Sequence, residues 1–136
     1  MATTPVTLKV KGFAEREVSK VLYSFDQAID KENQPAGIPR GGLITIKVKA
    51  MNDGNAELLK WMTSKTLHKD GSIVFMTSTD SHKQMKEVEF KKAYCIKFTE
   101  TWEDKIGNSE LAHFEEITIS CQEIKNGPAE YQNEWK

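Results

Sequence analysis

The sequence predicts a mainly β protein: an antiparallel β-barrel or sandwich of about seven strands with one flanking α-helix. Apolar and polar residues alternate through most of the chain, which is the pattern of strands with one dry and one wet face. Only residues 58 to 62 carry apolar side chains at helical spacing. Because one helix cannot cover both faces of a sheet, the strands must close on one another.

Length and composition limit the class of protein. The chain has 136 residues, which suits a single domain over residues 1–136 with a loop at 30–42 and a polar tail at 125–136. Hydrophobic residues make up 38% and charged residues 29%, so global disorder is excluded. With 19 basic and 20 acidic residues the net charge is -1, and the sequence predicts no nucleic-acid binding and no membrane insertion.

The N-terminal stretch MATTPVTLKVKG contains no apolar signal core, and no apolar run is long enough to cross a membrane. We therefore expect the protein to enter the cytoplasm first. Any export would then use a route that needs no cleavable signal.

The first half of the chain reads as strands around one long loop. Residues 6–11 alternate strictly and predict a strand that ends at Gly12. A second strand is predicted over 17–29, with a bend or bulge because its alternation is imperfect. Residues 30–42 hold two prolines and three glycines and predict a long loop.

The strand predicted over 43–49 raises the question of function. Three β-branched apolar residues alternate there with Thr45, Lys47 and Lys49. The wet face of this strand is therefore cationic, and it looks toward bulk solvent, a ligand or the rest of an assembly.

The helix should begin near Asp53 or Asn55, either of which can cap it, and should end before the turn dipeptide Asp70-Gly71. Its apolar stripe consists of Leu58, Trp61 and Met62, with Leu59 widening it.

The second half predicts strands at 72–76, 87–91, 93–103 and 111–124, separated by polar loops at 78–86 and 104–110. The even-numbered face of the strand at 93–103 is apolar and is expected to join the core. It consists of Tyr94, Ile96, Phe98 and Trp102.

The residues that carry chemistry show no site-like spacing. Cys95 and Cys121 lie inside predicted strands and are interpreted as small buried residues, although a disulfide between neighbouring strands stays open. His68, His82 and His113 are scattered, with no pair at metal-ligand spacing. We therefore predict no catalytic residue, no metal and no cofactor.

Five short motifs occur in a specific order: Arg40-Gly41-Gly42 before a strand, Trp61-Met62 in the helix, Lys69-Asp70-Gly71 before a strand, Ala93-Tyr94-Cys95, and a closing Glu134-Trp135. Together they resemble the tube proteins of type VI secretion systems, the Hcp (TssD) family, in its shorter divergent branch. The resemblance spans roughly residues 5–135.

This resemblance implies a structural protein and not an enzyme. It implies a β-barrel that assembles into hexameric rings, which stack into a hollow tube propelled by a contractile sheath. The implied partners are copies of the chain itself, sheath, baseplate and spike proteins, and effector proteins carried in the lumen. It also implies assembly in the cytoplasm, followed by export through the secretion system without a signal peptide.

Candidate lumen, ring or stacking residues follow from the resemblance and from the polar strand face. We expect that face to border a water-filled lumen or the outer wall of the tube. The glycines before the strand would let the backbone turn sharply, and a solvated loop end is the plain alternative for their motif. The candidates are Arg40, Gly41, Gly42, Thr45, Lys47, Lys49 and Trp135.

Two other functions compete with this interpretation. A monomeric β-barrel that binds a sugar or lipid would stay monomeric on size-exclusion chromatography with light scattering, whereas a tube subunit would form rings. A small hydrolase would need clustered histidines or carboxylates, and the spacing of these residues predicts none.

Overall fold

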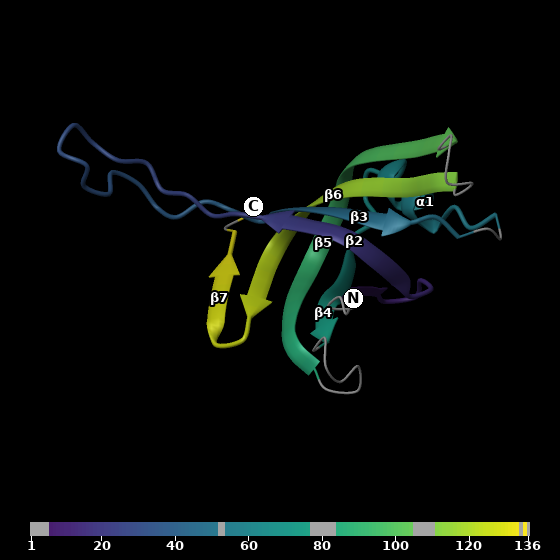
Figure 1. The fold of residues 1–136 in the computed structure, drawn as a ribbon. Helices are drawn as coiled ribbons and strands as arrows, with labels where there is room; N and C mark the ends of the chain where they lie inside the picture. The colour runs from purple at the N-terminus through teal and green to yellow at the C-terminus, as the bar shows by residue number, and fades with distance from the viewer. Residues whose placement is uncertain (1–5, 52–53, 77–83, 105–110, 134, 136) are drawn as a thin grey trace.

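A computed structural model describes residues 6–51, 54–76, 84–104, 111–133 and 135. It contains seven strands and one short helix (Figure 1). The elements are β1 (Val6–Val10), β2 (Arg16–Tyr23), β3 (Leu43–Lys49), α1 (Glu57–Met62), β4 (Lys69–Met76), β5 (Gln84–Asp104), β6 (Leu111–Asn126) and β7 (Ala129–Gln132).

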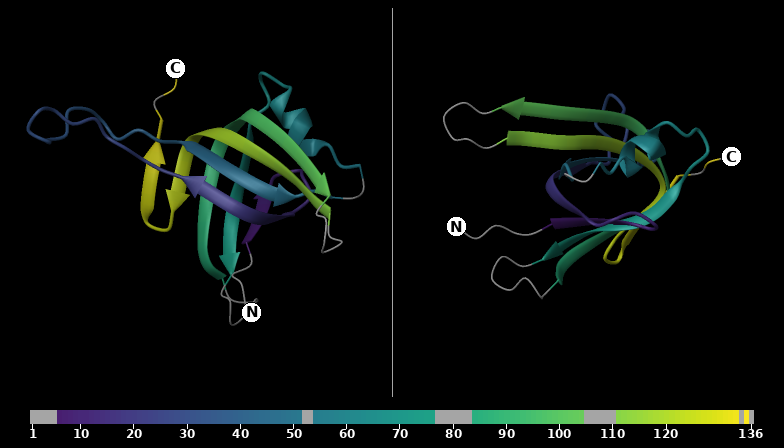
Figure 2. Two further views of the ribbon diagram at one scale, coloured as in Figure 1. Left: turned by 45° about the horizontal axis from the view of Figure 1, so that its top comes forward. Right: turned by 90° about the vertical axis from the view of Figure 1, so that its right-hand side faces the viewer.

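The strands form one antiparallel sheet that closes on itself (Figure 2). Their order is β3-β2-β1-β4-β5-β6-β7, and β3 also pairs with β6. The first six strands therefore close a barrel, and β7 is an extra strand on β6. The predicted fold class is confirmed.

The strand β5 takes part in two parts of the barrel wall. Up to Ala93 it pairs with β4 on one side and β6 on the other. From Lys97 to Asp104 it pairs, among the described strands, with β6 alone. As a result β2, β3, β6 and the second half of β5 form a four-stranded sheet on one side of the molecule.

The barrel interior is filled by side chains. Ile44, Ile46 and Val48 of β3 are fully buried. On β6, Ile44 and Ile46 lie opposite the buried Ile119 and Ile117. The helix α1 contributes Trp61, whose indole Nε1 donates a hydrogen bond to the Ala93 carbonyl at 3.1 Å. The predicted helix stripe is thus confirmed for Trp61 and Leu58, which are buried, whereas Leu59 is exposed.

The strands expected at 87–91 and 93–103 are a single strand, β5. Lys92 has a φ of 49°, and the pairing of β4 with β5 shifts register beside it. This bulge moves the buried face from even to odd positions. The prediction that Ile96 and Trp102 belong to the core is wrong, because these residues are 48% and 59% exposed. A second register shift, between Cys95 and Lys97, separates Trp102 from the bulge at Lys92.

The segment expected to be a polar tail, residues 125–136, is largely ordered as strand. Lys125 and Asn126 complete β6, and β7 folds back on it through a turn at Gly127 and Pro128. Tyr131 is half-buried in this hairpin, and its ring packs against the ring of Phe25. This contact between aromatic rings holds an otherwise polar segment in place.

The second strand was expected to reach residue 29, but β2 ends at Tyr23. Residues 24–40 form two extended legs that project from the barrel (left in Figure 1), and all of them are exposed. We call this segment the arm. Two isolated bridges join its legs, Asp26 with Arg40 and Ile29 with Pro35. The expected loop at 30–42 therefore covers the tip of the arm and the leg that returns from the tip to β3. The bulge expected in the second strand is confirmed between Val18 and Lys20 of β2.

Asp70-Gly71 is not a turn; it lies inside β4. A Cβ atom on Gly71 would overlap the backbone oxygen of Lys9 and would lie 2.7 Å from Cζ of Phe90. Glycine stands here because β1 and a core ring approach the backbone closely, not because the chain reverses.

Several expectations concern residues outside the described part of the chain. These are the cap candidate Asp53, His82, Glu134, residues 105–110 and most of the loop expected at 78–86, although residues 84–86 already belong to β5. Within the described ranges, no helix has the length and apolar character needed to span a membrane.

Candidate functional site

The predicted residues Thr45, Lys47 and Lys49 lie on the outward face of the four-stranded sheet. Thr45 Oγ1 is 3.1 Å from Thr118 Oγ1 of β6, and Lys47 lies opposite Glu116. The intervening β3 residues are buried in the barrel. This strand therefore separates a dry face from a polar one, as its alternation predicted.

The charges on this polar face are only partly compensated. Lys20 of β2 stands directly opposite Lys47, a like-charged cross-strand pair that is unfavourable. Lys47 Nζ lies 4.6 Å from the centre of the Phe114 ring, and Lys49 Nζ is 3.1 Å from Glu17 Oε1. Such a surface suits contact with water or with a macromolecule.

The four-stranded sheet has an open edge at each end. Among the described strands, residues 18–23 of β2 have no neighbour on the side away from β3. Within the same described part, residues 97–104 of β5 have no paired strand on the side away from β6. Unpaired strand edges are templates for pairing with another chain.

The glycine motif at the end of the arm is explained by close packing. Arg40 is exposed and pairs its backbone with Asp26 through hydrogen bonds of 2.7 and 2.9 Å. A Cβ atom on Gly41 would overlap the Phe25 ring. Gly42 has a φ of 102°, and a Cβ atom there would lie 2.9 Å from the carbonyl oxygen of Cys121. Both glycines therefore fit where the arm meets the barrel.

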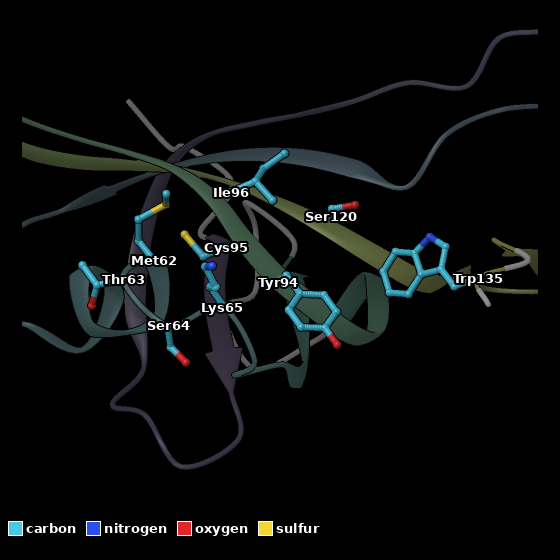
Figure 3. A pocket seen from close by; sticks show the side chains of 9 residues that line it. All are labelled: Met62, Thr63, Ser64, Lys65, Tyr94, Cys95, Ile96, Ser120 and Trp135. Carbon is cyan, nitrogen blue, oxygen red and sulfur yellow. The ribbon is translucent and has the colours of Figure 1, made fainter.

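Trp135 lies apart from this motif, with its ring 5.8 Å from that of Tyr94 and with 40% of its surface exposed. The two rings line a groove of about 540 Å³ beside the end of α1 (Figure 3). Met62 and Ile96 form its other apolar walls. The structure thus places Trp135 on a helix-side groove and Gly41 and Gly42 at the arm.

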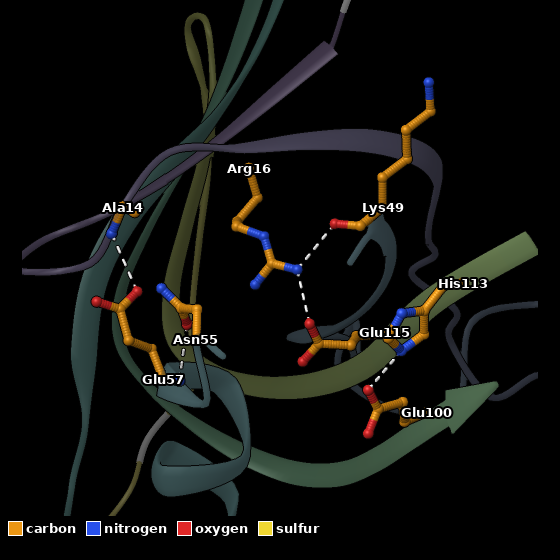
Figure 4. A network of polar contacts seen from close by, with 8 residues as sticks. All are labelled: Ala14, Arg16, Lys49, Asn55, Glu57, Glu100, His113 and Glu115. Atoms are coloured by element: carbon orange, nitrogen blue, oxygen red, sulfur yellow. Dashed lines mark hydrogen bonds and ion pairs between the residues drawn. The ribbon is translucent and has the colours of Figure 1, made fainter. Parts of the chain in front are cut away.

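A buried ion pair ties three strands together (Figure 4). Arg16 Nη2 of β2 donates to Glu115 Oε1 of β6 at 2.7 Å and to the Lys49 carbonyl of β3 at 2.8 Å. Both side chains are almost fully buried. The two partners are 99 residues apart in the chain, so no local pattern in the sequence could join them.

The remaining candidates for chemistry lie apart from one another. The His68 ring packs on Tyr94, and His113 Nε2 is 2.7 Å from Glu100 Oε2. Cys95 and Cys121 are free and buried, as interpreted, and burial raises the pKa of Cys95 to about 11 and that of Cys121 to about 12. Over the described ranges, no group of three or more metal-ligating side chains gathers.

Comparison with known proteins shows to which family a chain with this architecture belongs. The family model of the hemolysin coregulated protein Hcp (TssD) matches residues 2–136. The chain belongs to this family. Its solved relatives include Hcp1 from Flavobacterium johnsoniae, which is 35% identical over 95% of this chain and 99% of that chain, with a TM-score of 0.83.

More distant structures share the fold. Hcp1 from E. coli EAEC 042 is 14% identical over 97% of this chain and 99% of its own, with a TM-score of 0.72. The sheath/tube terminator of an extracellular contractile injection system, PVC, is 17% identical over 89% and 91% of the two chains, with a TM-score of 0.57. A comparison with curated proteins found no match.

Family membership confirms the resemblance seen in the motifs. Hcp proteins are structural tube components of contractile injection systems, and this coarse role applies to the chain. The open edges, the polar sheet face and the arm are therefore considered below as assembly surfaces.

Proposed function

We propose that this protein is a ring-forming tube subunit of a type VI secretion system. In this proposal six copies close into a ring, and rings stack into a hollow tube that a contractile sheath propels. The observation that carries the proposal is the four-stranded sheet, which has a polar outer face and an open edge at each end.

Ring closure follows from the two edges. The β2 edge of one copy is proposed to pair with the β5 edge of the next copy, residues 18–23 against residues 97–104. Because the two edges differ, the contact is head-to-tail, and such contacts generate a closed ring when the rotation adds up to a full turn. Both open edges of the four-stranded sheet are then covered.

The polar face of this continuous sheet is proposed to line the lumen. Thr45, Lys47 and Lys49 would then face a water-filled channel, while the opposite face stays packed in each barrel. This arrangement explains why one β3 face is polar although the strand lies in the middle of the sheet. Effector proteins carried in the channel would meet this face.

The arm is proposed to join stacked rings. It projects from the barrel and exposes Ile29 and Ile38, which are 60% and 66% accessible. Burying these side chains against the next ring would recover apolar surface that the single chain leaves in water. Arg40 at the arm and Trp135 at the helix-side groove are proposed as further contacts.

The other partners and the location are proposed on the family role. The sheath, baseplate and spike would contact the assembled tube. The whole chain, residues 1–136, would act as a single tube domain and not as an enzyme. It would assemble in the cytoplasm and leave through the secretion system without a signal peptide.

Light scattering during size-exclusion chromatography tests the ring directly. A particle of about six times the 15.4 kDa chain mass, with rings in electron micrographs, is expected. Thr99→Pro and Glu100→Pro provide a matched pair, because successive N–H groups of a strand point to opposite edges. In one variant the lost N–H points away from β6, so the hydrogen bonds between β5 and β6 are kept; this variant should keep the stability of the monomer and lose the ring. In the other variant the lost N–H points toward β6, and the monomer itself should be destabilised.

A monomeric ligand-binding barrel is the competing function, and the same experiment separates the two. The barrel interior is occupied by Ile44, Ile46, Val48, Ile117 and Ile119, which opposes an interior ligand. A wild-type protein that stays monomeric at high concentration with a ligand bound would overturn the tube proposal.

A further inference from the structure

The base of the arm is held by β7 and by the residue that follows it. We propose that Tyr131 and Asn133 are positioning residues that fix the direction in which the arm leaves the barrel. The consequence for tube assembly rests on the proposed function, because it takes the arm as the element that joins rings. We call this contact the clasp: Phe25, Gly41, Gly42, Tyr131 and Asn133.

The returning leg of the arm is bound through the backbone of Gly41. Its N–H donates to the Tyr131 hydroxyl at 3.1 Å, and that hydroxyl donates to Asn133 Oδ1 at 2.7 Å. Asn133 Nδ2 in turn donates to the Gly41 carbonyl at 3.3 Å. Both polar groups of one residue are therefore engaged by two side chains from the same short segment.

The outgoing leg is bound through the ring of Phe25. This ring lies so close to Gly41 that a Cβ atom would overlap it. On another side it meets the Tyr131 ring edge-on, with ring centres 4.9 Å apart. Tyr131 therefore contacts both legs, the outgoing one with its ring and the returning one with its hydroxyl.

The clasp is anchored in the barrel wall through β6. Asn133 Nδ2 donates to the Cys121 carbonyl at 2.9 Å, and the Asn133 N–H donates to the Gln122 carbonyl at 2.7 Å. The Cys121 N–H donates to the Gly42 carbonyl at 2.7 Å. Since Cys121 is fully buried, the clasp cannot shift without moving the core.

Beyond the clasp the arm has little to hold it against the barrel. Residues 24–40 are all exposed, and the contacts between its legs fix its shape but not its direction. A small rotation at the base therefore produces a large displacement at the tip. A clasped base holds the arm in one direction before docking, which lowers the entropy lost when two rings join.

Hydrogen exchange on the full-length chain tests the clasp without any assembly. Tyr131→Phe removes the hydroxyl and keeps the ring, and Asn133→Ala removes the amide. We expect the amides at the base of the arm, Gly41, Asp26 and Arg40, to exchange about tenfold faster in both variants, because the clasp holds the two legs together there, whereas the amides of β3 keep their protection. The control is Tyr94→Phe, which removes a tyrosine hydroxyl beside Trp135 and should leave arm exchange unchanged.

The result that overturns the proposal is unchanged arm exchange in Tyr131→Phe, the more conservative of the two variants. Electron microscopy adds the functional readout: both variants should form rings and yield at most a tenth as many stacked tubes as the wild type. If the wild type formed no rings, the tube function would fail while the exchange comparison still decided the clasp.

Discussion

At the scale of single residues, the ion pair between Arg16 and Glu115 is the contact that packs the start of β2 against β6. The distance from Arg16 Nη2 to Glu115 Oε1 is short, at 2.7 Å, and the two side chains are 2% and 6% exposed. Two further nitrogens of Arg16, Nε and Nη1, have no partner in the described structure. Such a pair is costly to bury, and it is costlier still to break, because one charge is then left alone in the interior.

Removing one partner should therefore destabilise the barrel strongly. Glu115→Ala is expected to lower the free energy of unfolding by about 3–5 kcal/mol. The matched control is Glu17→Ala, which breaks the exposed pair with Lys49 and should cost at most about 1 kcal/mol. Urea denaturation followed by circular dichroism measures both. Equal losses in the two variants would contradict the role assigned to the buried pair.

The buried thiols make stability depend on pH in the alkaline range. Burial raises the pKa of Cys95 to about 11 and that of Cys121 to about 12, from an ordinary value of 9.0. Above about pH 9 the unfolded chain loses thiol protons that the folded chain keeps, so stability is full below that pH and falls as the pH rises.

Thermal unfolding between pH 8 and 10.5 measures whether stability falls as the pH rises. This range spans the ordinary thiol pKa and stays below the raised values of the folded protein. The double variant Cys95→Ala/Cys121→Ala should lose less stability with rising pH than the wild type, because lysine and tyrosine titration is common to both. An identical pH slope in the two proteins would show that the thiols do not contribute.

At the scale of elements, the path of β4 depends on one glycine. Gly71→Ala would bring a methyl group onto the Lys9 carbonyl of β1 and onto the Phe90 ring, and neither the backbone nor a core ring can yield easily. We expect a loss of roughly 1–3 kcal/mol from this overpacking.

The control for this substitution lies on the arm. A Cβ atom on Gly37 would make an ordinary contact of 3.7 Å with Ala28, so Gly37→Ala should be neutral or slightly stabilising. Differential scanning calorimetry compares the two melting temperatures. A neutral Gly71→Ala would mean that β1 can move away from β4.

Alternation in the sequence predicted the number of strands correctly but not the bounds of every strand. Seven strands were expected and the described residues form seven, yet β5 replaces two expected strands and β7 was not expected. The bulge at Lys92 exchanges the buried and exposed faces of β5. The sequence does not indicate this bulge, because nothing in it shows that Lys92 has a positive φ. This exchange is why Ile96 is exposed although its parity indicated the core.

At the scale of the whole molecule, the arm projects from the barrel, so the proposed stacking contact can be tested apart from the stability of the barrel. All its residues are exposed, so it adds nothing to the core of its own barrel. The double variant Ile29→Ser/Ile38→Ser should therefore unfold within about 0.5 kcal/mol of the wild type. It should form rings but not tubes, because the apolar contact proposed between rings is lost.

The control variant Lys31→Ser/Glu32→Ser changes two polar residues at the arm tip, and it should keep both rings and tubes. Electron microscopy of the purified proteins measures the fraction of rings in stacks. Normal stacking of the Ile29→Ser/Ile38→Ser variant would remove the arm from the stacking contact.

The sequence by itself determined which face of β3 is wet, that the helix buries Leu58 and Trp61, and to which family the chain belongs. Alternation and helical spacing are local, and they are written in neighbouring residues such as those of β3 and α1. The tertiary structure decided which sheet edges stay open, how Arg16 meets Glu115, and why Gly41 and Gly42 sit beneath Phe25 and Asn133. These features join residues that are distant in the chain, and only closure of the barrel brings their atoms within contact distance.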